Sequence, residues 1–296
     1  MVMAKEHVFI PGRQFLPDVL EAKLQGEICH NVRIKEYPQG IIEVLTATRP
    51  VFREPGYESD QVPPRSAPAA EPGPDKQREN VLRAVRRARV TLRDLAMCND
   101  MRYFVTLTLA ADKVDRYDMR AIMRKVNAWC SNQVQRKGLA YILVPELHKD
   151  GAVHFHGFVN DAVSVVDSGT LSVPWSKRPR KPRSVAQRVE WLARGGQPVY
   201  NLPAWTIGYT TAIPLYGPIE RAISYCCKYV GKQIDGGGDE LPSKIGGRWF
   251  LHGGCKHRPE VSYADVDLAD FVPMDGAYEF GVEAARCAFV REVISL

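Results

Sequence analysis

The sequence predicts an α+β protein with a central antiparallel sheet, in which a hairpin carrying two histidines lies mid-sheet and helices pack on one face. Three observations support this fold class. Residues 103–109 are mostly β-branched, aromatic and leucine residues, as in a strand. Residues 140–147 and 153–160 are two further strand-like runs, and the turn residues between them predict an antiparallel hairpin. Residues 116–136 carry apolar side chains at helical spacing, so an amphipathic helix is available to cover the sheet.

The chain divides into three regions by composition. Residues 1–50 contain short β-like runs at 32–34 and 41–45, to which we attach no chemistry, so the role of this segment is unknown. Residues 51–76 are rich in proline with Gly, Ser and Glu between, which predicts a linker. Residues 77–296 are then expected to form the main domain.

Further elements are expected within the main domain. Helices are predicted at 75–95, where arginines form a basic face, and at 218–233. A strand-like run follows at 248–251, and the chain is expected to end in a helix at 279–293. Residues 167–200 are basic and interrupted by prolines, so we interpret them as a loop.

The basic loop supplies the candidate DNA contacts outside the main motifs. An exposed cluster of cations either binds DNA phosphates or is simply solvated, and the sequence leaves both open. The residues are Lys177, Arg178, Arg180, Lys181 and Arg183.

Bulk properties limit the class of protein. The net charge of +6 is compatible with a polyanionic partner. Seven cysteines without a CxxC pair indicate reduced thiols rather than a disulfide framework. Charged residues interrupt the N-terminus early and no apolar run reaches membrane-spanning length, so we expect no signal peptide, no membrane association and a cytoplasmic location.

The hairpin carries a candidate metal site. His154 and His156 alternate along a strand and therefore share a face, with Cα atoms roughly 7 Å apart. If the loop closes symmetrically about Asp150, Glu146 lies opposite His154 and joins that face. A two-residue turn would instead place Glu146 on the other face, so the interpretation requires an odd-numbered loop. Nearby His148 is a spare candidate that we expect to be solvated.

The donor set indicates which metal to expect. Two imidazoles and one carboxylate with open positions suit a divalent ion that must also bind a substrate oxygen. Mg²⁺ or Mn²⁺ would polarise a phosphate, whereas structural Zn²⁺ usually takes four protein ligands. A second cluster, Cys255 with His252 and His257, is interrupted by glycines and lacks a CxxC partner, so we do not favour it.

The second candidate feature is a helix with two tyrosines. Tyr225 and Tyr229 are four residues apart and share a helical face, and Lys228 and Lys232 each follow a tyrosine by three residues. A tyrosine hydroxyl is a poor nucleophile at neutral pH, and a neighbouring ammonium favours the phenolate and can hold a phosphate. Taken alone, the pattern also fits a surface helix with packed rings and solvated lysines.

Together these residues resemble the motifs of HUH endonucleases, which are named for histidine, hydrophobic residue, histidine. Residues 106–108, then Glu146 with residues 154–156, and then residues 225–232 follow the family's three motifs in order. The two tyrosines, and residues 205–208 upstream, resemble the rolling-circle replication initiators of single-stranded DNA phages. The resemblance covers roughly residues 100–255 and implies the ferredoxin- or RRM-like HUH nuclease fold.

The resemblance also implies an activity. A metal at Glu146, His154 and His156 polarises the scissile phosphate of single-stranded or supercoiled origin DNA. Tyr225 attacks, leaving a 5′-phosphotyrosine and a free 3′-hydroxyl primer, and Tyr229 cuts the regenerated origin before strand transfer. In this scheme Lys228 stabilises the phosphate charge and Lys232 is a lesser candidate.

One feature of many related enzymes is missing, and alternatives remain. The sequence has no Gly-x-x-x-x-Gly-Lys-Ser/Thr nucleotide-binding motif, so unwinding and synthesis would require a helicase and a DNA polymerase of a bacterial host. The competing interpretations are a two-tyrosine HUH transposase, a relaxase, a non-catalytic nucleic-acid-binding protein and a metal hydrolase with structural tyrosines. A relaxase usually carries three clustered histidines and an N-terminal tyrosine, and neither is seen here.

Overall fold

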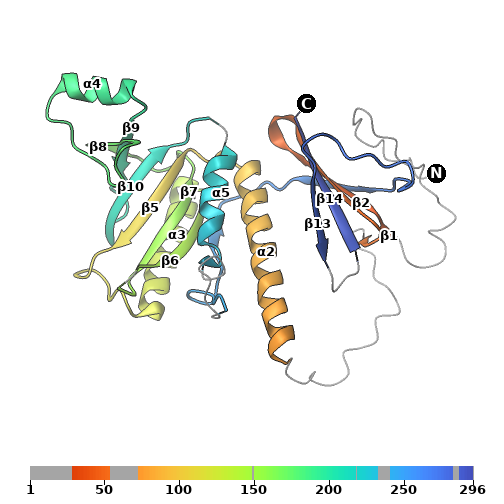
Figure 1. The fold of residues 1–296 in the computed structure, drawn as a ribbon. Helices are drawn as coiled ribbons and strands as arrows, with labels where there is room; N and C mark the ends of the chain where they lie inside the picture. The colour runs from red at the N-terminus through yellow and green to blue at the C-terminus, as the bar shows by residue number, and fades with distance from the viewer. Residues whose placement is uncertain are drawn as a thin grey trace. The chain divides into compact units, whose positions relative to one another are not determined.

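A computed structural model describes residues 29–53, 73–148, 150–217, 219–232, 241–282 and 287–295. The chain separates into two compact units (Figure 1). Unit 1 combines residues 1–71 with 259–296, and unit 2 comprises residues 72–258. Each contains an antiparallel sheet, so the mixed α+β class is confirmed. None of the described helices combines the length and apolar character needed to span a membrane.

Unit 2 is built on a seven-stranded antiparallel sheet, and its order is β11-β6-β7-β5-β10-β9-β8. The histidine strand is an interior strand, paired on both sides, as the sequence predicted. The strands are β5 (Tyr103–Leu109), β6 (Tyr141–Leu147), β7 (Val153–Val159), β8 (Val166–Ser172), β9 (Gln197–Asn201), β10 (Gly208–Pro214) and β11 (Leu251–Gly253).

One face of this sheet carries the main hydrophobic core. Helix α3 (Met119–Lys137) begins at Asp118, whose side chain accepts a hydrogen bond from the Ala121 N–H, and ends at a left-handed glycine. Its apolar stripe packs against alternate residues of β5 and β7, among them fully buried Phe155. Trp129 of α3 stacks edge-on against Trp205 at 5.0 Å between ring centroids. This core fixes the sheet that presents the histidines on the opposite face.

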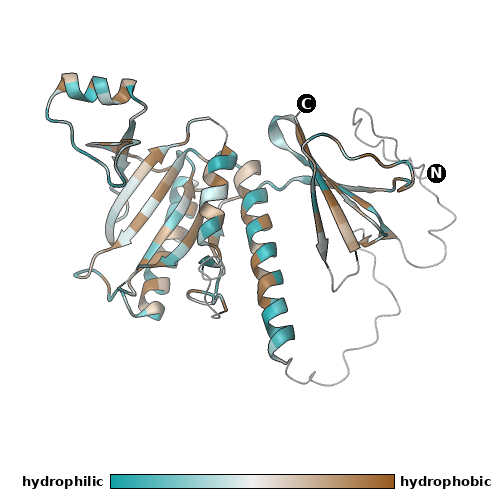
Figure 2. Cartoon of the chain, in the orientation of Figure 1, coloured by the Kyte–Doolittle hydropathy of each residue, from teal (hydrophilic) through white to brown (hydrophobic). Residues whose placement is uncertain are grey.

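Two other helices lie on the histidine face, so the prediction that helices cover one face only was wrong. Helix α5 (Ile219–Tyr229) contacts β7, since the Cys226 thiol lies 3.9 Å from the His156 carbonyl oxygen. Helix α2 (Pro74–Cys98) packs against α5, with Cys227 Sγ 3.8 Å from the Arg89 carbonyl oxygen. Figure 2 shows hydrophilic and hydrophobic bands alternating along α2. Its apolar positions, including buried Leu92, need a partner surface, and the sequence could not say which face supplies it.

The segment interpreted as a basic loop is partly regular. Residues 167–200 contain most of β8, helix α4 (Val185–Ala193) and most of β9. Ser184 caps α4 by accepting a hydrogen bond from the Gln187 N–H at 3.2 Å. The β8–β9 pairing depends on a register shift near Gly169, whose φ of 73° suits glycine. Polar, exposed strands at a sheet edge lack the apolar alternation on which the prediction relied.

Unit 1 contains a five-stranded antiparallel sheet of order β12-β2-β3-β14-β13. It confirms the two β-like runs near the N-terminus and shows that the C-terminal segment joins them. The elements are β2 (Val32–Tyr37), a 3₁₀ turn η1 (Pro38–Gly40), β3 (Ile41–Ala47), β12 (Glu260–Ala264), β13 (Tyr278–Val282) and β14 (Cys287–Ser295), with a separate pair β1 (Cys29–His30) and β4 (Phe52–Arg53).

The C-terminal helix predicted at 279–293 was therefore wrong. This segment lies in β13 and β14, and β14 pairs with β3 along its length. Val290, Val293 and Ile294 are β-branched and favour a strand once a partner edge is available. That partner lies more than 200 residues earlier, so no local pattern reveals it. Consequently the expected single domain at 77–296 ends near 258, and residues 259–296 belong with the N-terminal segment.

The predicted linker at 51–76 falls mostly outside the described residues. At its edges, Phe52–Arg53 form β4 and α2 already begins at Pro74. The predicted helix at 218–233 is α5, which ends earlier, at Tyr229. The strand-like run at 248–251 contributes only Leu251 to β11.

Candidate active site

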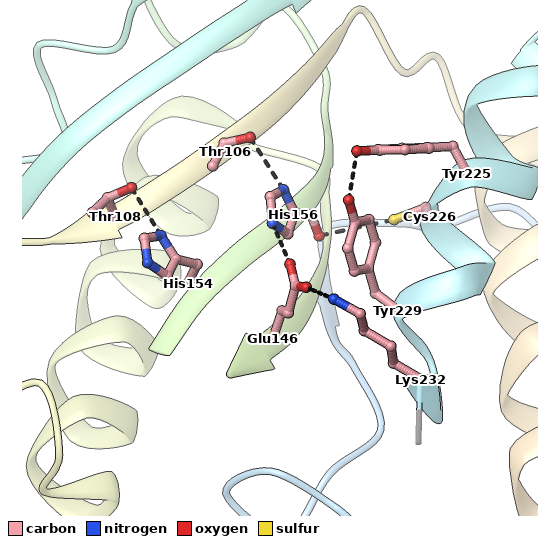
Figure 3. A network of polar contacts seen from close by, with 9 residues as sticks. All are labelled: Thr106, Thr108, Glu146, His154, His156, Tyr225, Cys226, Tyr229 and Lys232. Atoms are coloured by element: carbon pink, nitrogen blue, oxygen red, sulfur yellow. Dashed lines mark hydrogen bonds and ion pairs between the residues drawn. The ribbon is translucent and has the colours of Figure 1, made fainter. Parts of the chain in front are cut away.

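The histidine hairpin has the register that the metal site requires. Glu146 of β6 lies directly opposite His154 of β7. The connecting loop, residues 148–152, has an odd number of residues, and the His148 N–H closes it by donating to the Ala152 carbonyl at 2.8 Å. The prediction of an odd-numbered loop is confirmed. Glu146, His154 and His156 therefore share one face of the sheet, as Figure 3 shows.

Two threonines on β5 orient the histidines. Thr106 Oγ1 lies 3.1 Å from His156 Nδ1, and Thr108 Oγ1 lies 3.1 Å from His154 Nδ1 (Figure 3). The register places each threonine directly opposite its histidine. Holding Nδ1 leaves Nε2 of each ring for a ligand, which is how polar neighbours usually orient metal-binding histidines. The alternation of threonines in the strand was the only sequence signal for this role.

Glu146 is paired with two cations or potential cations. Its Oε2 lies 2.8 Å from His156 Nε2, and its other oxygen accepts a hydrogen bond from the Lys232 ammonium. Burial raises the pKa of Glu146, but the bonds from His156 and Lys232 outweigh it, and the pKa lies below its ordinary value. The carboxylate is thus anionic, as a metal ligand must be.

The three candidate ligands fit a divalent ion in chemistry, but their donor atoms are not gathered around one point. Among the described residues, no three His, Cys, Asp or Glu side chains are grouped closely enough to hold an ion. Glu146 instead bonds His156 directly, so it must rotate away from His156 and Lys232 to share an ion with His154. Burial, followed by the neighbouring His148 and His156, lowers the pKa of His154 and favours the neutral form that binds metals.

The spare histidine of the turn behaves as expected from the sequence. His148 is exposed and pairs with Asp150, whose Oδ1 lies 3.3 Å from its Nδ1. Its ring centroid is 5.2 Å from that of His154, so it lies beside the candidate ligands. We do not place it among the ligands, because its partner is the turn carboxylate.

The tyrosine helix brings both hydroxyls to the histidine face. The Tyr229 ring stacks on the His156 ring at 4.5 Å between centroids with an interplanar angle of 13°. The Tyr229 hydroxyl donates to the Tyr225 hydroxyl at 2.5 Å (Figure 3). Phe104 of β5 contacts the Tyr225 ring edge-on at 5.6 Å. Burial, and then the bond to Tyr225, raise the pKa of Tyr229 above its ordinary value.

The two lysines are placed differently from the sequence expectation. Helix α5 ends at Tyr229, and Gly231 adopts a φ of 75°, which turns the chain so that Lys232 reaches Glu146. The Lys232 ammonium also lies 5.6 Å from the centroid of the Tyr229 ring. Lys228 lines an adjoining cavity with Tyr225. Lys232, expected to be the lesser candidate, is therefore the lysine in contact with the candidate ligands.

Two cavities flank the tyrosines. One of about 250 Å³ is lined by Glu146, Tyr229 and Lys232 together with Arg248. The other, of about 650 Å³, has a lining that includes both tyrosines, both lysines and Arg89. Arg89 and Arg248 were not predicted as site residues. The basic face of the helix at 75–95 was a sequence signal for Arg89.

The weaker DNA candidates lie elsewhere in unit 2. Three of them, Arg180, Lys181 and Arg183, line a separate cavity of about 520 Å³ with Trp175 and Trp191, and Lys177 and Arg178 belong to the same segment. The candidate zinc cluster at Cys255 is not formed by the described residues.

The comparisons agree with this placement of the motifs. Residues 102–234, slightly under half of the chain, match the family model of the replication-associated protein ORF2, a family of phage replication proteins. The match begins just before β5 and extends just beyond Lys232, so it contains the threonines, Glu146, both histidines, both tyrosines and both lysines. Searches of curated proteins and of solved structures gave no match.

Proposed function

We propose that this protein is a metal-dependent DNA endonuclease and strand transferase that initiates rolling-circle replication of a single-stranded DNA phage genome. The observation that carries the proposal is the stacking of Tyr229 on His156, 4.5 Å between centroids, with the Tyr225 hydroxyl bonded to that of Tyr229. Two potential nucleophiles from a helix thus meet a pair of same-face histidines from the sheet. The match of this region to the replication-associated family supports the same function.

Glu146, His154 and His156 are the residues that we propose hold a divalent ion, Mg²⁺ or Mn²⁺, which would polarise the scissile phosphate when bound. The chain's own contribution is orientation. Thr106 and Thr108 hold the two rings by Nδ1, and the buried Phe155 between them anchors the strand in the core. Lys232 supplies positive charge beside the carboxylate and beside the Tyr229 ring.

In the proposed reaction a tyrosine oxygen attacks the phosphorus of one phosphodiester. The bond from phosphorus to the 3′-oxygen breaks, the tyrosine loses its proton, and the 3′-oxygen gains one. The products are a 5′-phosphotyrosine and a free 3′-hydroxyl that primes synthesis, and attack by a 3′-hydroxyl on the adduct reverses the step to join strands. Lys232 and Lys228 stabilise the phosphate charge from the two sides of the tyrosines.

The two tyrosines are proposed to serve the same phosphate position in turn. Their hydroxyls are within one hydrogen bond of each other, so either oxygen reaches the same point with a small side-chain movement. Tyr225 is 47% exposed and therefore accessible to an incoming strand, which supports its use in the first cut. Tyr229, stacked on His156, then remains available to cut the regenerated origin.

The partners follow from the same proposal. The DNA is a single-stranded or supercoiled origin, and a host helicase and DNA polymerase complete the cycle in the bacterial cytoplasm. An HUH transposase would share the chemistry. A non-catalytic nucleic-acid-binding protein is the competing class, and it differs in forming no covalent product.

The test is trapping of a covalent adduct. The full chain is incubated with an end-labelled pool of random-sequence single-stranded oligonucleotides and Mn²⁺, and adducts are resolved on a denaturing gel. We expect a labelled band with wild type that EDTA abolishes, and none with the Tyr225→Phe/Tyr229→Phe double variant. Tyr278→Phe, an exposed tyrosine of unit 1, is the matched control and keeps the band. Absence of an adduct with every divalent ion tried would refute the catalytic proposal.

A further inference from the structure

The edge of the unit 2 sheet farthest from β11 carries a strongly basic segment, residues 166–201, which we name the basic excursion. It holds seven Lys and Arg and two Asp and Glu, a net charge of +5 in a chain whose net charge is +6. Both carboxylates are already paired, Asp167 with Arg188 at 2.7 Å and Glu190 with Arg194 at 3.0 Å. The remaining five cations are exposed and form no ion pair with any carboxylate in the described part of the chain.

The cations are carried on an ordered backbone. Arg180 and Leu171 exchange two backbone hydrogen bonds of 2.8 Å, which tie the segment to β8. The Gln187 side chain accepts a hydrogen bond from the Arg183 N–H at 2.7 Å, and Ser184 caps the helix that follows. Fixed cations lose less side-chain and backbone freedom on binding than cations on an unstructured loop.

Aromatic rings adjoin these cations. Trp175 and Trp191 contact each other edge-on at 6.2 Å between centroids, and Trp175 is still 45% exposed. The Arg194 guanidinium lies 4.3 Å from the centroid of Trp175 and braces it. The two rings line a cavity of about 520 Å³ with Arg180, Lys181 and Arg183. A cavity of this size is large enough for a nucleobase and its sugar, given that small-molecule sites measure roughly 300–1,000 Å³.

We propose that this cavity binds single-stranded DNA, with one unpaired base stacked on Trp175 and the flanking phosphates on Arg180, Lys181 and Arg183. An exposed tryptophan among cations that have no carboxylate partner is the combination that single-stranded DNA uses, because a base offers a π-face and its phosphates offer negative charge. Duplex DNA offers the phosphates but keeps its bases stacked. The proposal rests on the proposed function, to which it adds a second DNA contact outside the catalytic face.

The test measures binding of the full chain without cleavage. Fluorescence anisotropy with a labelled mixed-sequence oligonucleotide, in EDTA, gives Kd for the single strand and for its duplex. Trp175→Ala is expected to raise Kd for the single strand roughly 5- to 150-fold, the range for loss of one stacked base, and to leave the duplex Kd unchanged. Trp175→Tyr keeps an aromatic face and is expected to restore most of the affinity.

Charge is tested separately, since Trp175→Ala also removes the contact with Trp191. Lys181→Ala is expected to reduce the slope of log Kd against log salt by about 0.7 for the single strand. Lys137→Ala, an exposed lysine at the end of α3, removes the same charge elsewhere and leaves the slope unchanged. Thermal unfolding confirms that each variant is folded.

Two results overturn the proposal: single-strand Kd unchanged by Trp175→Ala, or equal losses for single strand and duplex, which would mean phosphate binding alone. Because EDTA prevents metal-dependent nicking, the outcome is independent of catalysis. If no adduct forms but Trp175-dependent binding is found, only the nicking proposal fails. If the adduct forms and Trp175→Ala binds normally, only this inference fails.

Discussion

Thr106 offers a sharp test of the histidine geometry, because its hydroxyl is the hydrogen-bond partner of the ring that stacks on Tyr229. Thr106→Val is nearly isosteric, keeps a β-branched residue in β5, and removes the 3.1 Å bond to His156 Nδ1. The Mn²⁺ concentration that gives half-maximal activity is expected to rise roughly 10- to 100-fold, the effect of losing a partner that orients a metal-binding histidine. In free energy this is about 1.4–2.8 kcal/mol.

The effect on stability is expected to be smaller than the effect on metal dependence. The His156 side chain is 15% exposed, so the unpaired nitrogen regains part of its hydrogen bonding from water. The loss should therefore fall at the lower end of the roughly 1–3 kcal/mol for an unsatisfied buried polar group. The assay is the initial rate of adduct formation as a function of Mn²⁺ concentration, with unfolding by denaturant measured in parallel.

The control is Thr211→Val on the next strand. Thr211 pairs with Thr106 across β10 and β5, and the histidine Nδ1 atoms are bonded by Thr106 and Thr108 instead. It should leave the Mn²⁺ dependence unchanged. The reasoning is refuted if Thr106→Val titrates with Mn²⁺ as the wild type does, or if Thr211→Val shifts the titration equally.

Two further predictions concern the lysines and the sheet. Lys232→Ala should slow adduct formation about 10-fold and Lys228→Ala less than about 3-fold, because a charge-assisted hydrogen bond to Glu146 is lost only in the first and Lys232 is largely exposed; single-turnover rates decide, and a larger loss in Lys228→Ala would contradict the assigned positions. Gly157→Ala should destabilise unit 2 by about 3 kcal/mol or more, since a Cβ there would lie 1.8 Å from the Ile142 carbonyl oxygen. Gly281→Ala, where a Cβ meets nothing within 4 Å, is the comparison in thermal unfolding, and equal melting of the two variants would show that β6 shifts freely.

Much of the candidate site was predictable because its parts are local. Period-two alternation put His154 and His156 on one face, and the loop length decided whether Glu146 joined them, which the register confirms. Helical spacing likewise put Tyr225 and Tyr229 one turn apart. The position of Lys232 was not predictable in this way, because it depends on where α5 ends and on the backbone at Gly231.

The sequence by itself determined the strand β5, the histidine hairpin with its odd loop, and the amphipathic helices, since these follow from alternation, turn residues and apolar spacing within a few residues. Only the tertiary structure decided that α5 and α2 cover the histidine face, so that Tyr229 stacks on His156. It also decided that residues 287–295 form β14 beside β3, and that residues 166–201 fold around Trp175. The physical reason is common to all three: each depends on a partner surface distant in the chain, and the free energy of that pairing outweighs local propensity.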